Sequence, residues 1–124
     1  MRIALISPGG SFLGNFPKSI EFIDKHKESM SKFSDGVSGP GLGLLIIAAL
    51  TPNEFEVDFI DENVRKVDFS LKYDIVAISI MTRQATRGYE IAKVFKNSGA
   101  HIIIGGIHAT VMSDEVLHYA DSVV

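Results

Sequence analysis

Short uninterrupted apolar runs constrain the fold of this chain more than any other feature. Three of them stand out: RIALIS at 2–7, DIVAISI at 74–80 and HIII at 101–104. A strand that is apolar along its whole length is typical of a parallel sheet, because helices cover both faces of such a sheet. The segment FEVDFI at 55–60 instead alternates apolar and acidic residues, which predicts a half-buried strand nearer a sheet edge. The chain is therefore expected to build a mainly parallel sheet.

Segments with helical character separate these strands. A helix is predicted to open at Thr82 or Arg83 and to run through Asn97, where Ser98-Gly99 ends it. The other expected elements are a helix at 42–50, a short surface helix within 17–36, a loop or short helix at 63–73, a helix at 111–119 with Ser113 as its N-cap, and a strand that begins at 121. Strands that alternate with helices through right-handed crossovers predict an α/β fold, a doubly wound sheet of about five strands with helices on both faces.

Length and composition are those of one globular domain over residues 1–124, and they exclude several classes of protein. The chain has 22% charged residues and a net charge of −3, so it lacks the basic character of most nucleic-acid binders. It has no cysteine, which excludes disulfides and thiolate metal sites and is compatible with the cytoplasm, the expected location. The most apolar stretch, 42–50, is far too short to cross a bilayer, so we expect it to pack against the sheet inside the domain, with no membrane partner.

Ligands of a doubly wound sheet bind beyond the carboxyl ends of the strands. Three loops are predicted to meet there: Pro8-Gly9-Gly10, Met81-Thr82-Arg83 and the segment GGIH at 105–108. Glycine at such a place lets a bound molecule approach bare backbone and lets the chain adopt positive φ. Gly105-Gly106 by itself is equally compatible with a plain tight turn, but the convergence of all these loops at one edge favours a ligand site.

Several classes of ligand and active site fail at these loops. The first loop, PGGSFLG at 8–14, lacks the glycine spacing of a dinucleotide site, and no Gly-Lys-Ser phosphate loop is present. The histidines lack the spacing of a metal site, and no serine lies in a nucleophile elbow. Asp61 and Glu62 follow the second strand and are interpreted as a solvated turn. We therefore expect neither a metal site nor a self-sufficient active site in this chain.

A resemblance to a known family covers nearly the whole chain. It is carried by MRIALISP at the start, GPGLGLLIIAALTP before the second strand, FEVDFIDENV, and the long segment from YDIVAISIMTRQ to HIIIGGIHAT. In this order and spacing the motifs resemble the N-terminal cobalamin-binding domain of radical S-adenosylmethionine enzymes. The resemblance implies a flavodoxin-like, or Rossmann-like, fold that holds the corrin of cobalamin against the carboxyl edge of the sheet, with the nucleotide tail threaded between strands.

The resemblance also implies which residues bind the cofactor. The segment from Ser79 to Thr82 is expected near the nucleotide tail, and Gly105-Gly106 would let the tail approach. His108 belongs to the Gly-Gly-x-His-x-Thr pattern of the family and is a candidate for lining the site or for packing its loop. The first loop and the glycines at 39–43 are expected to approach the corrin. The predicted cofactor-binding residues are therefore Pro8, Gly9, Gly10, Gly41, Ser79, Met81, Thr82, Gly105, Gly106 and His108.

One departure from related families concerns the cobalt ligand. Cobalamin domains of mutases and of methionine synthase carry Asp-x-His-x-x-Gly after the first strand, and the histidine of this motif coordinates the cobalt. Residues 7–14 contain no histidine in this chain. The resemblance to the radical enzymes therefore implies that cobalamin is bound here without a histidine ligand.

The family places a 4Fe-4S cluster and S-adenosylmethionine in a following barrel that carries three clustered cysteines. Because this chain has no cysteine, it is expected to be a fragment of a longer radical S-adenosylmethionine protein, a methyltransferase-like enzyme, with that barrel as its partner in the same polypeptide. The chain alone is not expected to catalyse a reaction. A second interpretation stays open, namely a non-catalytic α/β module that kept the fold but lost cobalamin, or that binds another small ligand.

Overall fold

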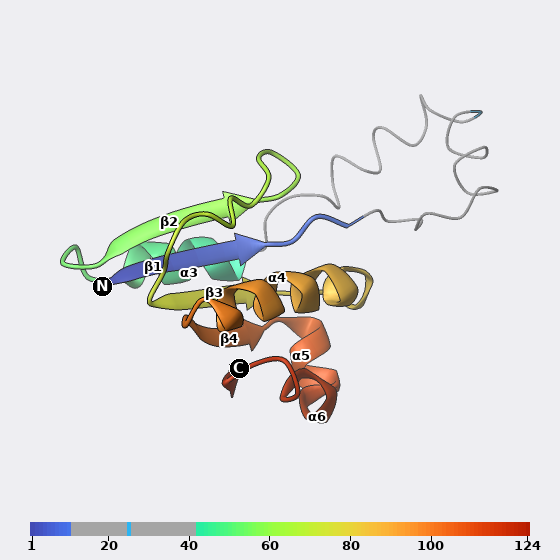
Figure 1. Ribbon diagram of the computed structural model, residues 1–124. Helices are drawn as coiled ribbons and strands as arrows, with labels where there is room; N and C mark the ends of the chain where they lie inside the picture. Colours follow the sequence, from blue (N-terminus) through green and yellow to red (C-terminus); the bar gives the residue numbers. More distant parts are fainter. Residues whose placement is uncertain (11–24, 26–41) are drawn as a thin grey trace.

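The computed structural model describes residues 1–10, 25 and 42–124, which form one parallel sheet with helices on both faces (Figure 1). In chain order the elements are β1 (Arg2–Ser7), α3 (Leu42–Leu50), β2 (Glu56–Asp61), β3 (Ile75–Ser79), the 3-10 helix η1 (Thr82–Gln84), α4 (Ala85–Asn97), β4 (His101–Gly105), α5 (Ile107–Val111), α6 (Ser113–Val116) and β5 (Ser122–Val123). The expected doubly wound sheet of five strands is confirmed, and every strand pair in it is parallel.

The strand order is β2-β1-β3-β4-β5, the order of flavodoxin-like folds. From β1 the chain moves outward to β2 and then crosses back to β3, so the strand order reverses between β1 and β3. The register aligns Ser7 with Asp61 and Ile6 with Ile78, and so brings the carboxyl ends of β1, β2 and β3 together. A reversal of this kind is where such sheets bind their ligands.

The main core lies between the sheet and α4. Alternate residues of each strand point to this face, and Val76 is fully buried there in one cluster with Ile91 and Phe95 of α4. Gly88 allows α4 to lie close to the sheet, because a Cβ at Gly88 would be 2.6 Å from Cγ2 of Ile80. The carboxyl end of β3 and the first turns of α4 are therefore held in fixed relation to each other.

The helices after β4 differ from the sequence expectation of one helix at 111–119. The first of them, α5, begins at Ile107, directly after Gly106 adopts φ +97° and turns the chain out of β4. The helix breaks at Met112, and α6 then begins. The expectation that Ser113 is an N-cap is wrong, since Met112 occupies that position and no side chain caps the helix.

The remaining predictions about the helices have mixed outcomes. The helical segment that opens at Thr82 and ends at Asn97 is confirmed, and Gly99, with φ +94°, follows its C-cap Ser98. The segment 63–73 forms turns and bends rather than a helix. Apart from Lys25, which is helical, the short helix expected within 17–36 lies outside the described residues.

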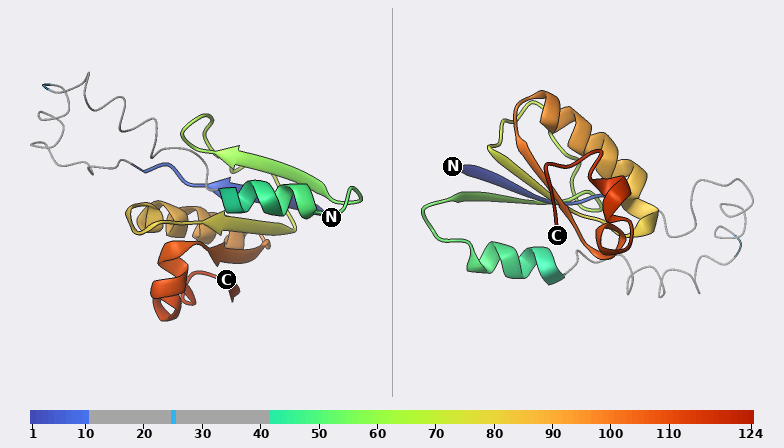
Figure 2. Two further views of the ribbon diagram at one scale, coloured as in Figure 1. Left: turned by 180° about the vertical axis from the view of Figure 1, so that it is seen from behind. Right: turned by 90° about the horizontal axis from the view of Figure 1, so that it is seen from below.

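The helix α3 lies against β1 on the face opposite α4 (Figure 2). It packs against the sheet as expected, but the domain does not enclose it. Leu44 is its one buried residue, whereas its other large apolar side chains are exposed. Within the described parts of the chain, no helix is long and apolar enough to cross a membrane.

Candidate functional site

The side chain of Gln84 joins the loops that follow β1 and β3. Its Nε2 donates to the carbonyl oxygen of Pro8 at 2.5 Å, and its Oε1 accepts from the amide of Met81 at 3.0 Å. Gln84 is buried, so water does not compete for either bond. Gly10 packs against this side chain, because a Cβ at Gly10 would be 2.9 Å from Gln84 Cγ. One amide side chain therefore bridges the point at which the strand order reverses.

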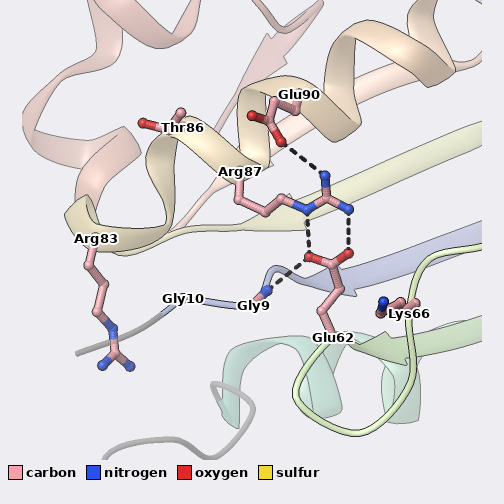
Figure 3. Close-up of a pocket in the computed structure, with 8 residues that line it drawn as sticks. All are labelled: Gly9, Gly10, Glu62, Lys66, Arg83, Thr86, Arg87 and Glu90. Carbon is pink, nitrogen blue, oxygen red and sulfur yellow. Dashed lines mark hydrogen bonds and ion pairs between the residues drawn. The ribbon is translucent and has the colours of Figure 1, made fainter. Parts of the chain in front are cut away.

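Glu62 connects the loop after β2 to α4 and to the loop after β1 (Figure 3). Its carboxylate accepts from Arg87 Nε at 3.0 Å, from Arg87 Nη2 at 2.7 Å and from the Gly9 amide at 3.0 Å. Arg87 also donates to Glu90 at 2.9 Å. Burial opposes the charge on Glu62, but the hydrogen bonds from Arg87 and Gly9 outweigh it and hold the pKa of Glu62 below its ordinary value. The interpretation of Asp61 and Glu62 as a solvated turn is wrong, since Asp61 is buried and the Glu62 side chain is 7% exposed.

A pocket of about 540 Å³ opens between these loops (Figure 3). It lies at the carboxyl ends of β1 and β2 and beside the first turns of α4. Its wall contains backbone, a hydroxyl group and basic side chains, which can donate to amide or phosphate oxygens, and two acidic side chains that are bonded to Arg87. The residues that line it are Gly9, Gly10, Glu62, Lys66, Arg83, Thr86, Arg87 and Glu90.

The double glycine at the end of β4 has an explanation within the chain. Gly106 has φ +97° and ψ 179°, a conformation that is essentially restricted to glycine. A Cβ at Gly106 would lie 2.7 Å from the carbonyl oxygen of Ile80. The Ile80 amide donates to the Gly105 carbonyl at 2.9 Å, and the His108 amide donates to the Ile80 carbonyl at 3.2 Å. These contacts support the tight-turn interpretation, and contact of the glycines with a ligand stays a prediction.

His108 packs its loop against α4 and α6. His108 is 6% exposed, and its ring has Nε2 at 3.0 Å from the Tyr89 hydroxyl and Nδ1 at 3.2 Å from the Thr82 hydroxyl. Tyr89 donates its single hydroxyl proton to Glu115 at 2.7 Å, so the histidine Nε2–H donates to the Tyr89 oxygen. The Tyr89 ring also stacks on Tyr119, with centroids 4.0 Å apart. Of the two roles predicted for His108, the packing role is the one that these contacts explain.

The other predicted residues lie where the three loops meet, with one exception. Ser79, the last residue of β3, is half-buried, whereas Met81 is 41% exposed and Thr82 is exposed. Gly41 lies outside the described residues, so its predicted approach to a ligand stays a prediction. Within the ranges that the structure describes, no group of side chains could hold a metal ion.

Sequence reasoning missed the polar side chains that organise this edge. They are Glu62, Gln84 and Arg87. A usable signal is the segment TRQATRG at 82–88, because it places several long polar side chains in the first turns of a helix whose next turns are apolar. Polar residues at that end of a helix face the carboxyl edge of a doubly wound sheet.

Comparison with protein families assigns this chain to a known type of domain. Residues 34–124 match the model of the B12 binding domain. The chain belongs to the B12-binding domain family. The resemblance to a cobalamin-binding domain is thereby confirmed, over most of the part of the chain that forms the sheet.

Curated relatives of this B12-binding domain are named as methyltransferases. Bacteriochlorophyllide d C-12(1)-methyltransferase of Chlorobaculum tepidum is 38% identical over 103 residues, which cover 81% of this chain and 22% of the relative. Bacteriochlorophyllide d C-8(2)-methyltransferase of the same organism is 33% identical over 84 residues, 67% of this chain and 19% of the relative. An uncharacterised methyltransferase of Pyrococcus horikoshii is 31% identical over 93 residues, again 67% of this chain and 20% of the relative. The chain thus spans about a fifth of the length of these relatives, and no solved structure matches it significantly.

The polar groups at the edge of the B12-binding domain fit the chemistry of cobalamin. The corrin carries carboxamide side chains and the nucleotide tail carries a phosphate, and their oxygens accept hydrogen bonds. The edge offers two kinds of hydrogen-bond donor for these oxygens. One is the neutral hydroxyl of exposed Thr82, and the other is the positively charged ammonium group of Lys66. Gly9 and Gly10 add backbone without side chains at the same pocket. The residues present therefore suit cobalamin better than a small apolar ligand.

Proposed function

We propose that this domain binds cobalamin across the carboxyl edge of its sheet, above the reversal between β1 and β3. The observation that carries the proposal is the match of residues 34–124 to the B12 binding domain, in a chain whose candidate loops gather at that reversal. Cobalamin, when bound, supplies the chemistry of methyl transfer. The chain's own residues bind and orient it, and none of them is assigned a catalytic step.

Each loop has a proposed part in holding the cofactor. Pro8, Gly9, Gly10 and Gly41 approach the corrin, and the polar pocket beside the first loop supports this part because its wall contains Gly9 and Gly10. The segment 79–82 lies along the nucleotide tail, which the exposure of Met81 and Thr82 supports. The glycines at 105–106 and the packed His108 give the loop after β4 its shape.

The cobalt is proposed to have no histidine ligand from the protein. Support comes from the sequence of residues 7–14, which lacks the Asp-x-His-x-x-Gly motif. Support also comes from His108, whose ring nitrogens lie within hydrogen-bonding distance of Tyr89 and Thr82. A histidine held in this way would have to give up at least one of these contacts before a ring nitrogen could coordinate a metal.

The domain is proposed to act within a longer polypeptide, a radical S-adenosylmethionine methyltransferase. A following barrel would hold the 4Fe-4S cluster and S-adenosylmethionine and would be the partner of this domain. The names of the relatives, which are methyltransferases, and the small share of their length that the chain spans support this proposal.

A second candidate is an α/β module that kept the fold and lost cobalamin or binds another small ligand. The observation that favours it is the contact between Gly106 and Ile80, because this contact explains the double glycine without any ligand. The two candidates predict different results in a binding experiment.

Titration of hydroxocobalamin into the protein, followed by the corrin absorption bands, tests the first candidate. We expect saturable binding and a spectrum without the signature of a protein imidazole on cobalt. Absence of saturable binding, both in this chain and in the longest natural reading frame that contains it, would favour the module without cobalamin. Saturable binding with an imidazole-ligated spectrum would retain the cofactor but overturn the proposed ligation.

A further inference from the structure

The hydroxyl of Thr82 is bonded to a series of side chains that runs through the domain. Thr82, the first residue of η1, is exposed just after the carboxyl end of β3, and its Oγ1 lies 3.2 Å from Nδ1 of the buried His108. The other ring nitrogen of His108 lies 3.0 Å from the hydroxyl of Tyr89, which donates to Glu115 at 2.7 Å. Side chains from η1, α5, α4 and α6 thus connect the proposed edge with a carboxylate on the surface.

The proton of Tyr89 fixes part of the bonding in this series. Burial and the bond to Glu115 raise the pKa of Tyr89 above its ordinary value, so the hydroxyl keeps its proton at neutral pH. This single proton is used on Glu115, so the Tyr89 oxygen accepts from His108 and Nε2 of the ring carries a hydrogen. The ring position whose proton can change is therefore Nδ1, which faces Thr82.

The Thr82 hydroxyl has opposite roles in the two charge states of His108. In the neutral ring Nδ1 has no hydrogen, so it accepts from Thr82, and the hydroxyl then offers only lone pairs to a ligand. In the protonated ring Nδ1–H donates to Thr82 Oγ1, and the hydroxyl proton is free to be donated outward. An acceptor oxygen of a ligand therefore binds Thr82 better when His108 is protonated.

The groups that face His108 can hold a positive charge on its ring. Glu115 Oε1 lies 3.5 Å from His108 Nε2. The hydrogen bond from Tyr89 holds the pKa of Glu115 below its ordinary value, so this carboxylate is negative in the pH range where histidines titrate. On α4, the group that faces the ring is Tyr89 itself. The other titratable or charged side chains on η1, α6 and the turn that follows are Arg83, Asp114, His118 and Tyr119.

We propose that Thr82 and His108 bind the phosphate of the nucleotide tail of cobalamin as a proton-linked pair, in which His108 takes up a proton from solvent and the Thr82 hydroxyl donates to a phosphate oxygen. His108 is a positioning residue, because it sets the direction of the Thr82 bond and does not touch the cofactor. A phosphate fits better than a corrin carboxamide, since its negative charge favours the protonated ring, whereas a neutral carboxamide offers both donors and acceptors. This inference rests on the proposed function, in which segment 79–82 lies along the tail.

Proton uptake on binding tests the proposal. We would titrate cyanocobalamin into this chain, and into the longest natural reading frame that contains it, by calorimetry in buffers with different heats of ionisation. Cyanide occupies the position on cobalt at which a bound water would otherwise titrate. We expect uptake of about half to one proton per bound cobalamin at neutral pH, and an affinity roughly five- to fiftyfold lower at about pH 8 than at about pH 6.

Substitutions separate this linkage from a purely structural role. Thr82→Val removes the hydroxyl and His108→Gln removes the titrating ring, so both variants should lose the proton uptake and the pH dependence, whereas Thr82→Ser should keep them. Thr51→Val is the matched control, because it removes a threonine hydroxyl that donates to a backbone carbonyl within and just after α3. His118→Gln is the control for the histidine that lies beside Glu115. Both controls should bind and take up protons like the wild type.

Three outcomes overturn the proposal. The first is binding that takes up no proton and has the same affinity at both pH values. The second is proton uptake that persists in Thr82→Val or in His108→Gln, which would leave His108 a purely structural role. The third is equal proton uptake with cobinamide, which has the corrin but no nucleotide phosphate, because the acceptor would then lie on the corrin. Absence of saturable binding in both proteins would reject the proposed function as well, whereas binding without linkage would reject this inference alone.

Discussion

Gln84 on η1 donates to the carbonyl of Pro8 after β1, and this bond crosses the reversal in strand order. We expect Gln84→Leu to destabilise the domain by about 1–3 kcal/mol, because the buried carbonyl of Pro8 and amide of Met81 both lose their partner. Urea denaturation would measure the change. The control is Lys93→Leu on the exposed side of α4, for which we expect a change within about 0.5 kcal/mol. Equal stability of the Gln84 variant and the wild type would mean that water satisfies these groups.

Gly106→Ala should destabilise the domain by roughly 1–3 kcal/mol or more, because the backbone conformation is strained for any residue with a Cβ. In addition, the new Cβ would lie 2.7 Å from the Ile80 carbonyl oxygen. Gly43→Ala is the control, since a Cβ there meets nothing within 4 Å, and we expect it to stabilise α3 by about 0.5–1 kcal/mol. Thermal unfolding compares the two variants. A fully stable Gly106→Ala would contradict the close packing of β3 and β4, and would leave a ligand as the reason for the glycine.

Glu62→Gln should make stability less dependent on pH. The pKa of Glu62 is lowered in the folded state, so its ionised form stabilises the fold above the unfolded pKa of about 4.3. This contribution is lost as the pH falls through the folded pKa. We expect the wild type to exceed the variant by roughly 1–3 kcal/mol at pH 7 and the difference to shrink below pH ~4.

The control for this experiment is Glu90→Gln, which removes the other carboxylate bonded to Arg87. Its side chain is 59% exposed, so we expect an effect below about 1 kcal/mol. Urea denaturation across pH 3–7 would measure both variants. A difference between the wild type and Glu62→Gln that stays constant from pH 7 to pH 3 would show that the charge of Glu62 is not what stabilises the edge.

Met81→Arg should weaken cobalamin binding by at least tenfold, because it places a large charged side chain beside the proposed tail site. Met81 is 41% exposed, so stability should change by less than about 0.5 kcal/mol. Val94→Arg, at 42% exposure on α4, is the matched control and should bind like the wild type. Titration with hydroxocobalamin compares the three proteins. Wild-type affinity in Met81→Arg would remove segment 79–82 from the proposed site.

The strands could be predicted from sequence because a strand that is buried on both faces is a continuous apolar run, which is visible in a short segment of the chain. The run at 2–7 coincides with β1, and the helix that opens at Thr82 ends at Asn97 as expected. The gathering of the loops after β1, β3 and β4 follows directly, since parallel strands all end at one edge. The sequence therefore predicted the place of the candidate site and its glycine-containing loops, but not the polar side chains that organise it.

The apolar run at 42–50 was predictable as a helix but not as an exposed one. Its composition indicates that every side is meant to be covered. The exposure of this helix depends on which other elements lie on the same face of the sheet. The tertiary structure places α3 and α4 on opposite faces, so α4 does not cover α3.

Composition and periodicity by themselves determined that this protein is a doubly wound parallel sheet, and they indicated at which edge to expect a ligand, because both are local properties of the chain. Only the tertiary structure decided which polar groups meet at that edge. Gln84 and Pro8 are 76 positions apart, and Glu62 and Arg87 are 25 apart. An acidic residue after a strand has the same local sequence whether it is solvated or paired. Its state depends on strand register and on how closely α4 approaches the sheet, and these are set by the packing of the whole domain.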